Sequence, residues 1–186
     1  MRTGSDPSAA QRPALPTEVF RACVGEFGAG VTVVTGEHEG APAGMTLNSF
    51  TSVSLEPLLV LVSLAHGSRT LYVVRESGRF AVSILRREQR DVAIAFATPG
   101  APFASEYVTR TSDGFVVVRG AVATLHCGVS RLITAGDHEL VLGLVSGITH
   151  NGGEPLIFHR GRFGGLAPDA TVPPGHPIAL EEGAGW

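Results

Sequence analysis

GMTLNSFTSVSLEPLLV, residues 44–60, is the stretch that decides the fold, and AHGSRT, residues 65–70, follows shortly after it. Hydrophobic residues alternate in it with hydroxyl and amide side chains, which is the two-residue repeat of β-strands. Polar atoms among apolar strands cost free energy unless they are hydrogen-bonded. We therefore expect a bound polar ligand to satisfy these groups, which are Thr46, Asn48, Ser49, Thr51, Ser52 and Ser54.

The segments around this stretch are rich in Val and Ile and are separated by Gly and Asp, which predicts further strands. Continuous apolar runs such as PLLVLVSLA, residues 57–65, need cover on both faces. Many strands and few helices predict a mainly β fold, a closed or split barrel, and exclude a doubly wound α/β sheet. The other strands are expected at 31–36, 41–48, 50–54, 80–85, 115–127, 129–137, 138–149 and 155–160.

A few short helices flank the predicted barrel. Thr17 is expected to cap the first, with Gly28 and Gly30 ending it. Its apolar stripe is Val19, Phe20, Cys23, Val24 and Phe27. The second begins after the N-cap Ser68 and ends before Gly78, and the third covers 88–97.

The composition narrows the function classes. A length of 186 residues with 44% hydrophobic residues predicts one folded domain, at 16–165, between tails at 1–15 and 166–186. The formal net charge of -3 gives no electrostatic reason to expect nucleic acid. All 14 basic residues are Arg, so chemistry that needs a lysine amine is excluded.

The two cysteines, Cys23 and Cys127, form no CxxC pair and are expected to be small core residues rather than ligands of a metal. The first sixteen residues lack the apolar core of a signal peptide, and the run at 57–65 is too short to span a bilayer. We therefore expect a cytoplasmic protein that does not bind membranes.

The turn at residues 67–70 is a candidate anion site. If Ser68 caps a helix, the backbone N–H groups that follow it lie at the positive helix end, where Arg69 adds charge and Thr70 a hydroxyl. The preceding strands, with Met45 and Val53 beside their polar groups, would place a polar-edged aromatic ring on one sheet face. The alternatives are an ordinary capped helix and a solvated outer face of a strand pair.

These residues resemble those of the flavin reductase domain with an FMN-binding split barrel, the NADH-dependent partner of two-component flavin monooxygenases. The resemblance runs from about Phe20 to Gly165. Its motifs, in chain order, are FGAGVTVVTG, GMTLNSFTSVSLEPLLV, GSRT, SGRFAVSIL followed by Gln89, GDHELVLGLV and RGRFGGL. The chain departs from the common pattern at Leu58, where a second proline is frequent, and at Ser83, where Asn is frequent.

The resemblance implies a Greek-key-like split β-barrel and assigns residues to the ligands. His138, in the GDH segment, would contact NADH, and Phe163 would cover the flavin ring. The other implied flavin contacts are Met45, Thr46, Asn48, Ser49, Ser52, Val53, Ser54, Ala65, Gly67, Ser68, Arg69 and Thr70.

The function implied is hydride transfer from NADH to FMN or FAD, after which reduced flavin diffuses to a separate monooxygenase. The sequence leaves NADPH open, and the family implies a homodimer. The flavin carries the chemistry, so no catalytic side chain is expected. The alternatives are a pyridoxamine phosphate oxidase-like FMN oxidase, which the lack of Lys disfavours, a non-catalytic flavin-binding module, and a purely structural barrel.

Overall fold

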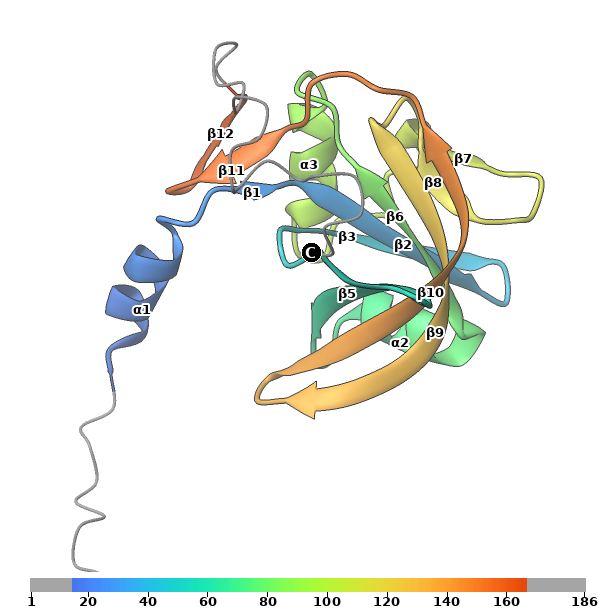
Figure 1. Ribbon diagram of the computed structural model, residues 1–186, viewed down its shortest axis with the longest axis horizontal. Coiled ribbons are helices and arrows are strands. Elements are labelled where there is room, and N and C mark those ends of the chain that lie inside the picture. Colours follow the sequence, from blue (N-terminus) through green and yellow to red (C-terminus); the bar gives the residue numbers. More distant parts are fainter. Residues whose placement is uncertain (1–14, 167–186) are drawn as a thin grey trace, which may run out of the picture.

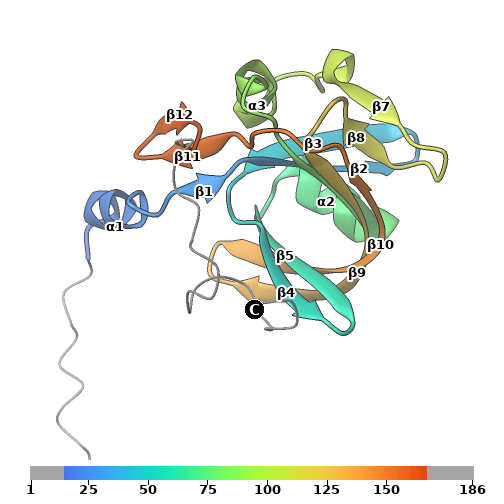
Figure 2. The ribbon, with the colours of Figure 1, turned by 45° about the horizontal axis from the view of Figure 1, so that its top comes forward.

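A seven-stranded antiparallel sheet, in the order β3-β2-β6-β9-β10-β5-β4, curls around the centre of the protein (Figures 1 and 2). The computed structural model describes residues 15–166. Within them β3 and β4 are the two edges of this sheet, so it curls without closing, as expected of a split barrel. Its strands are β2 (Thr32–His38), β3 (Ala41–Leu47), β4 (Thr51–Leu55), β5 (Leu58–Ala65), β6 (Arg79–Ile84), β9 (Ala123–Ala135) and β10 (His138–His150).

The core lies on both sides of this sheet, as the continuous apolar runs predict. Successive residues of a strand point to opposite faces. Val33 therefore packs in one hydrophobic cluster, with Leu85 and Phe96, and Val34 packs in another, with Leu64 and Phe80. Burial on both faces explains why strands such as β2 carry Val at consecutive positions.

Two helices flank β3. α2 (Arg69–Ser77) packs on β2 and β3, and α3 (Arg90–Ala97) packs on β3. The predicted caps of α2 are confirmed, because the Ser68 Oγ accepts a hydrogen bond from the Leu71 N–H and Gly78 follows the helix with a φ of 67°. The third predicted helix begins two residues later than expected, at Arg90.

The first helix, α1 (Thr17–Val24), differs from the predicted helix in three respects. Pro16 and not Thr17 occupies its N-cap position, and it ends before Gly25, earlier than the predicted Gly28. None of its residues is buried, although its apolar stripe predicts burial. Cys23 is accordingly exposed, whereas Cys127 is buried as expected. The helix extends away from the sheet (Figure 1).

The strands expected at 115–127 and 129–137 are divided differently. Strand structure is interrupted at 119–122, between β8 (Val116–Val118) and β9, and β9 continues without interruption through Gly128. Gly128 is paired with both neighbouring strands, so ladder hydrogen bonds outweigh its weak strand propensity.

Two smaller sheets complete the structure. In the first, β7 (Val108–Arg110) pairs with β8, and a 3₁₀ turn (Ser105–Tyr107) precedes β7. The second has three strands, in the order β1 (Ala29–Gly30), β11 (Ile157–His159) and β12 (Arg162–Gly164). Among residues 15–166 there is no helix of the length and apolarity needed to cross a membrane. The tails expected at 1–15 and 166–186 lie almost entirely outside the described residues.

Candidate functional site

A groove of about 640 Å³ lies over β3, between the N-terminal end of α2 and the C-terminal end of α3. Its volume is that of a typical small-molecule site. Six of the predicted flavin contacts line it together, from two segments distant in sequence: Met45, Thr46, Gly67, Ser68, Arg69 and Thr70.

The α2 end of the groove is suited to an anion. The Ser68 side chain satisfies only the Leu71 N–H, at 3.2 Å, and the first N–H groups of a helix have no carbonyl partner within it. The helix dipole places positive charge at the same point. Arg69 is exposed beside it, whereas Thr70 is only 2% exposed. A phosphate would find backbone donors, a hydroxyl and a guanidinium here.

The floor of the groove is fixed by close packing of β3 on α3. The Thr46 hydroxyl donates a 2.7 Å hydrogen bond to the Ala93 carbonyl oxygen. A Cβ at Gly44 would lie 2.8 Å from Cε1 of Phe96, so glycine is required for this approach. Thr46 therefore already donates its hydroxyl hydrogen within the protein, so a ligand could only donate hydrogen bonds to the two lone pairs of this oxygen.

The polar groups of residues 48–54 lie elsewhere, because β3 is paired with β2 and β4 with β5. The expectation that the strands now seen as β3 and β4 pair with each other is therefore wrong. The protein also satisfies part of this polar set without a ligand. Ser49 donates to the Ser63 carbonyl oxygen and accepts from the Ser63 N–H, and the Ser54 hydroxyl accepts from the Glu56 N–H. Thr51 donates to the Ser52 carbonyl oxygen.

The remaining residues of this set differ in exposure. Asn48 and Val53 are exposed, and Ser52 and Ala65 are half-buried. None of the residues in 48–54, nor Ala65, lines the groove over β3. A flavin ring that touches them would extend out of the groove, toward the other edge of the sheet.

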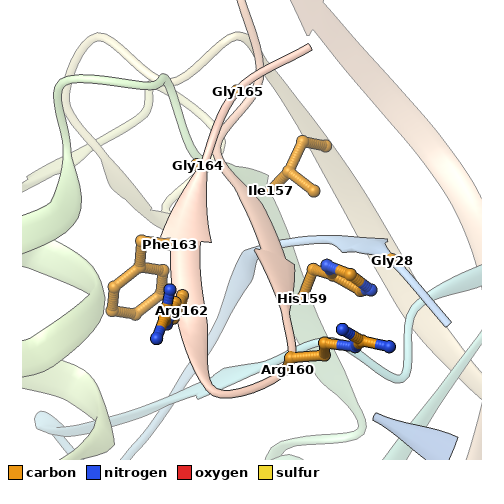
Figure 3. A pocket seen from close by; sticks show the side chains of 8 residues that line it. All are labelled: Gly28, Ile157, His159, Arg160, Arg162, Phe163, Gly164 and Gly165. Carbon is orange, nitrogen blue, oxygen red and sulfur yellow. The ribbon is translucent and has the colours of Figure 1, made fainter. Parts of the chain in front are cut away.

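Phe163 lines a separate pocket of about 620 Å³ in the β11–β12 hairpin. Figure 3 shows its ring on the α3 side of the hairpin, with His159 and Arg160 on the other side. The ring packs on Phe158, at a centroid distance of 5.4 Å, and the Arg90 guanidinium lies 5.9 Å from its centroid. Arg90 begins α3, whereas the groove lies at the other end of that helix, so a single chain does not bring Phe163 into the groove.

His138 begins β10, directly after the turn of the β9–β10 ribbon. Its Nδ1 lies 2.7 Å from a carboxylate oxygen of Asp137. The hydrogen bond from His138 lowers the pKa of Asp137 below its ordinary value of 3.8. The carboxylate orients the ring, and Nε2 remains available to a ligand.

The turn before α2 is tied to the same ribbon by a group that the sequence reasoning missed. The buried Glu139 carboxylate lies 3.2 Å from Nε2 of His66 and 3.5 Å from Nη2 of Arg75. The His66 N–H also donates to the Asp137 carbonyl oxygen, at 2.9 Å. The predicted nicotinamide segment and the predicted phosphate turn are thus held together, a contact between positions distant in sequence that no local pattern announces.

Residues 24–167 match the family model described as the flavin reductase like domain. The chain belongs to this family. Among curated relatives, an NADH-dependent flavin reductase of Rhodococcus is 39% identical over 151 residues, which cover 79% of this chain and 85% of the relative. The reductase subunit HsaB of a flavin-dependent monooxygenase of Mycobacterium tuberculosis is 34% identical over 163 residues, covering 86% and 87%.

Solved structures of flavin reductases agree with the observed fold. The NADH:FAD oxidoreductase SgcE6 of Streptomyces globisporus, in complex with NAD and FAD fragments, is 38% identical, with a TM-score of 0.78 over 83% of this chain and 95% of that one. BorF, the flavin reductase component of a bacterial two-component tryptophan halogenase, is 33% identical with a TM-score of 0.76, covering 81% and 98%. The split-barrel prediction is confirmed.

The groove over β3 also has a wall that sequence reasoning did not assign. It consists of the end of α3 and the following loop, residues 95–103, with Pro42 and Ala43 of β3. The Pro and Gly residues at 99–102 indicate a loop, and Phe103, which follows them, packs edge-on against Phe96 with ring centroids 5.5 Å apart. The sequence does not announce this contact.

Proposed function

We propose that this chain is a flavin reductase that uses NADH to reduce FMN or FAD and releases the reduced flavin to a separate monooxygenase. The observation that carries the proposal is the groove over β3, with a capped, positive helix end at one side and an apolar floor. It is suited to the phosphate and side chain of a flavin nucleotide. Membership of the flavin reductase family and relatives named as NADH-dependent reductases support the same conclusion.

A bound flavin supplies the electron chemistry, because its ring accepts a hydride from a nicotinamide stacked on it. The residues of this chain act by positioning. Ser68, Arg69 and Thr70 hold the phosphate, and Met45 and Thr46 line the groove beside it. His138 holds the nicotinamide nucleotide, and Phe163 covers the ring. Gly67 belongs to the phosphate turn. The remaining predicted contacts lie beside the ring, and they are Asn48, Ser49, Ser52, Val53, Ser54 and Ala65.

We further propose that the protein acts as a homodimer. The apolar stripe of α1 is exposed, with Phe20 at 60%, and Phe27, which follows the helix, is 79% exposed. The edge strand β4 exposes Val53 and Leu55 as well. Large exposed apolar surfaces mark interfaces, and a second copy of the chain would cover them. A second copy would also complete a ring site that one chain leaves divided between the groove and the Phe163 pocket.

The cellular compartment and the partner protein are inferred from the free thiols and from the relatives. Both cysteines are free, which suits a reducing compartment, and we place the protein in the cytoplasm. Relatives that are reductase components of two-component monooxygenases support a separate oxygenase as the partner. Hydroxyl and backbone contacts in the groove, in place of a covalent link, suit a flavin that leaves after each turnover.

Stopped-flow measurement of NADH oxidation, with FMN, FAD and riboflavin added in turn, tests the proposal. We expect oxidation to depend on added flavin and to be faster with NADH than with NADPH. Tight flavin binding without NADH oxidation would favour a flavin-binding module. Oxidation of an amine substrate by tightly bound FMN, without nicotinamide, would favour an oxidase.

A further inference from the structure

A second cavity, of about 480 Å³, adjoins the groove over β3 on the side away from the predicted ring contacts. The two cavities share Pro42 and Phe103 in their linings. Pro42 lies near the start of β3, whereas Met45 and Thr46 lie near its end. The second cavity therefore adjoins the groove near the start of β3, whereas the predicted ring contacts follow the end of that strand.

The junction between the two cavities is aromatic. Phe103 is half-buried and is held edge-on against Phe96, with ring centroids 5.5 Å apart. Phe96 is itself buried and packs against Gly44 of the groove floor. A fixed aromatic ring beside a proline offers an apolar surface on which a planar base can stack.

The far wall of the second cavity carries two arginines, Arg110 and Arg119. Arg110 forms an ion pair with Glu37. Arg119 uses Nη1 to donate a 2.7 Å hydrogen bond to the Glu106 carbonyl oxygen, which leaves its positive charge unneutralised by that contact. The hydroxyl residues Ser105 and Thr109 complete the polar lining. Aromatic, hydroxyl and guanidinium groups together suit an adenylate.

We infer that the second cavity binds the adenylate half of FAD, with the adenine at Phe103 and the distal phosphate within reach of Arg119. This inference rests on the proposed function and extends it, because FMN ends at the phosphate turn and would leave this cavity empty. NADH also contains an adenylate. FAD is favoured because the second cavity shares Pro42 and Phe103 with the groove that the phosphate turn lines, whereas His138 lines neither cavity.

The test compares FAD and FMN binding by flavin-fluorescence titration of the full chain without NADH. Wild-type protein should bind FAD more tightly than FMN. Arg119→Gln, which retains a donor for the Glu106 carbonyl oxygen, should weaken FAD binding about tenfold and change FMN binding less than about twofold. Arg119→Lys should restore most of the loss. Arg131→Ala, at an exposed position of β9 outside both cavities, is the matched control and should change neither.

Equal FAD and FMN affinities in wild-type protein, or equal effects of Arg119→Gln on both, would overturn the inference. The inference would also be overturned if Arg119→Gln raised the KM for NADH, measured with FMN as acceptor, and left FAD affinity unaltered. The cavity would then bind the adenylate of NADH. In each of these outcomes flavin still binds and the proposed function stands. If wild-type protein bound no flavin, both proposals would be wrong.

Discussion

The phosphate end and the ring end of the predicted flavin site differ in how much of each a single chain completes. At the phosphate end, Ser68 caps α2, Thr46 is bonded to α3, and both line one groove. At the ring end, Phe163 lies in a different pocket and Val53 is exposed on an edge strand. Local sequence therefore builds the helix end that is proposed to hold the phosphate, whereas the residues predicted to contact the ring are divided between separate places in a single chain.

Disruption of the proposed homodimer should have the largest effect on activity. The double variant Phe20→Ser with Val24→Ser removes two exposed apolar side chains from the stripe of α1. We expect the dimer dissociation constant to rise on the order of a hundredfold or more, because the two protomers together lose four apolar side chains from the interface. Sedimentation velocity measures it, and NADH oxidation should fall at protein concentrations where the dimer dissociates.

Arg21→Ala is the matched control for this variant, because Arg21 lies on the same helix outside the apolar stripe. It should leave the association unchanged. A double variant that associates as tightly as wild-type protein would show that α1 is not part of the interface.

The next effect concerns the phosphate end. Arg69→Ala should weaken FMN and FAD binding alike, by about tenfold, because a charge-assisted contact to the phosphate is lost at an exposed position. Riboflavin lacks the phosphate, so its affinity should not change. Fluorescence titration with the three flavins measures this, and an equal loss for riboflavin would contradict the assignment.

A smaller effect is expected at the nicotinamide segment. His138→Ala removes a half-exposed ring oriented by Asp137 and should raise the apparent KM for NADH about threefold, by loss of one hydrogen bond. Flavin affinity should hardly change, because His138 does not line the groove. Steady-state kinetics at saturating flavin give the first value and titration gives the second. A change in flavin affinity alone would remove His138 from the nicotinamide site.

The smallest expected effect is on thermal stability, at Asp113, which lies outside both ends of the predicted flavin site. Hydrogen bonds from Thr111 and from His126, the latter at 2.8 Å, hold the pKa of Asp113 below its ordinary value of 3.8. A lowered native pKa contributes stability that is present above the unfolded value and is lost as the pH falls through the native one. Asp113→Asn should therefore lower the Tm slightly at pH 7 and by less at pH 2. Thermal unfolding at the two pH values measures this, and an equal Tm loss at both would contradict it.

Particular residues show how far the sequence reasoning reached. Ser68 and Gly78 marked the ends of α2 correctly, because capping depends on neighbours within a few residues. The break in 115–137 was misplaced, because Gly128 is held in β9 by pairing with β6 and β10. The hydroxyl groups of Thr46 and Ser49 were expected to need a ligand for their hydrogen bonds. In the structure they are bonded to the backbone of Ala93 and Ser63 instead. In these cases the deciding partner is distant in sequence or in another strand.

The sequence by itself determined the mainly β fold, the two-sided burial of its strands and the capped helix start at residues 67–70, which is proposed as an anion site. Hydrophobic period and capping chemistry are local properties, so they can be read without the fold. Only the tertiary structure decided that β3 and β4 lie at opposite edges, that Glu139 ties the ribbon to the turn before α2, and that residues 95–103 wall the groove. Each of these depends on contacts between segments far apart in the chain, whose free energy appears only when the sheet curls.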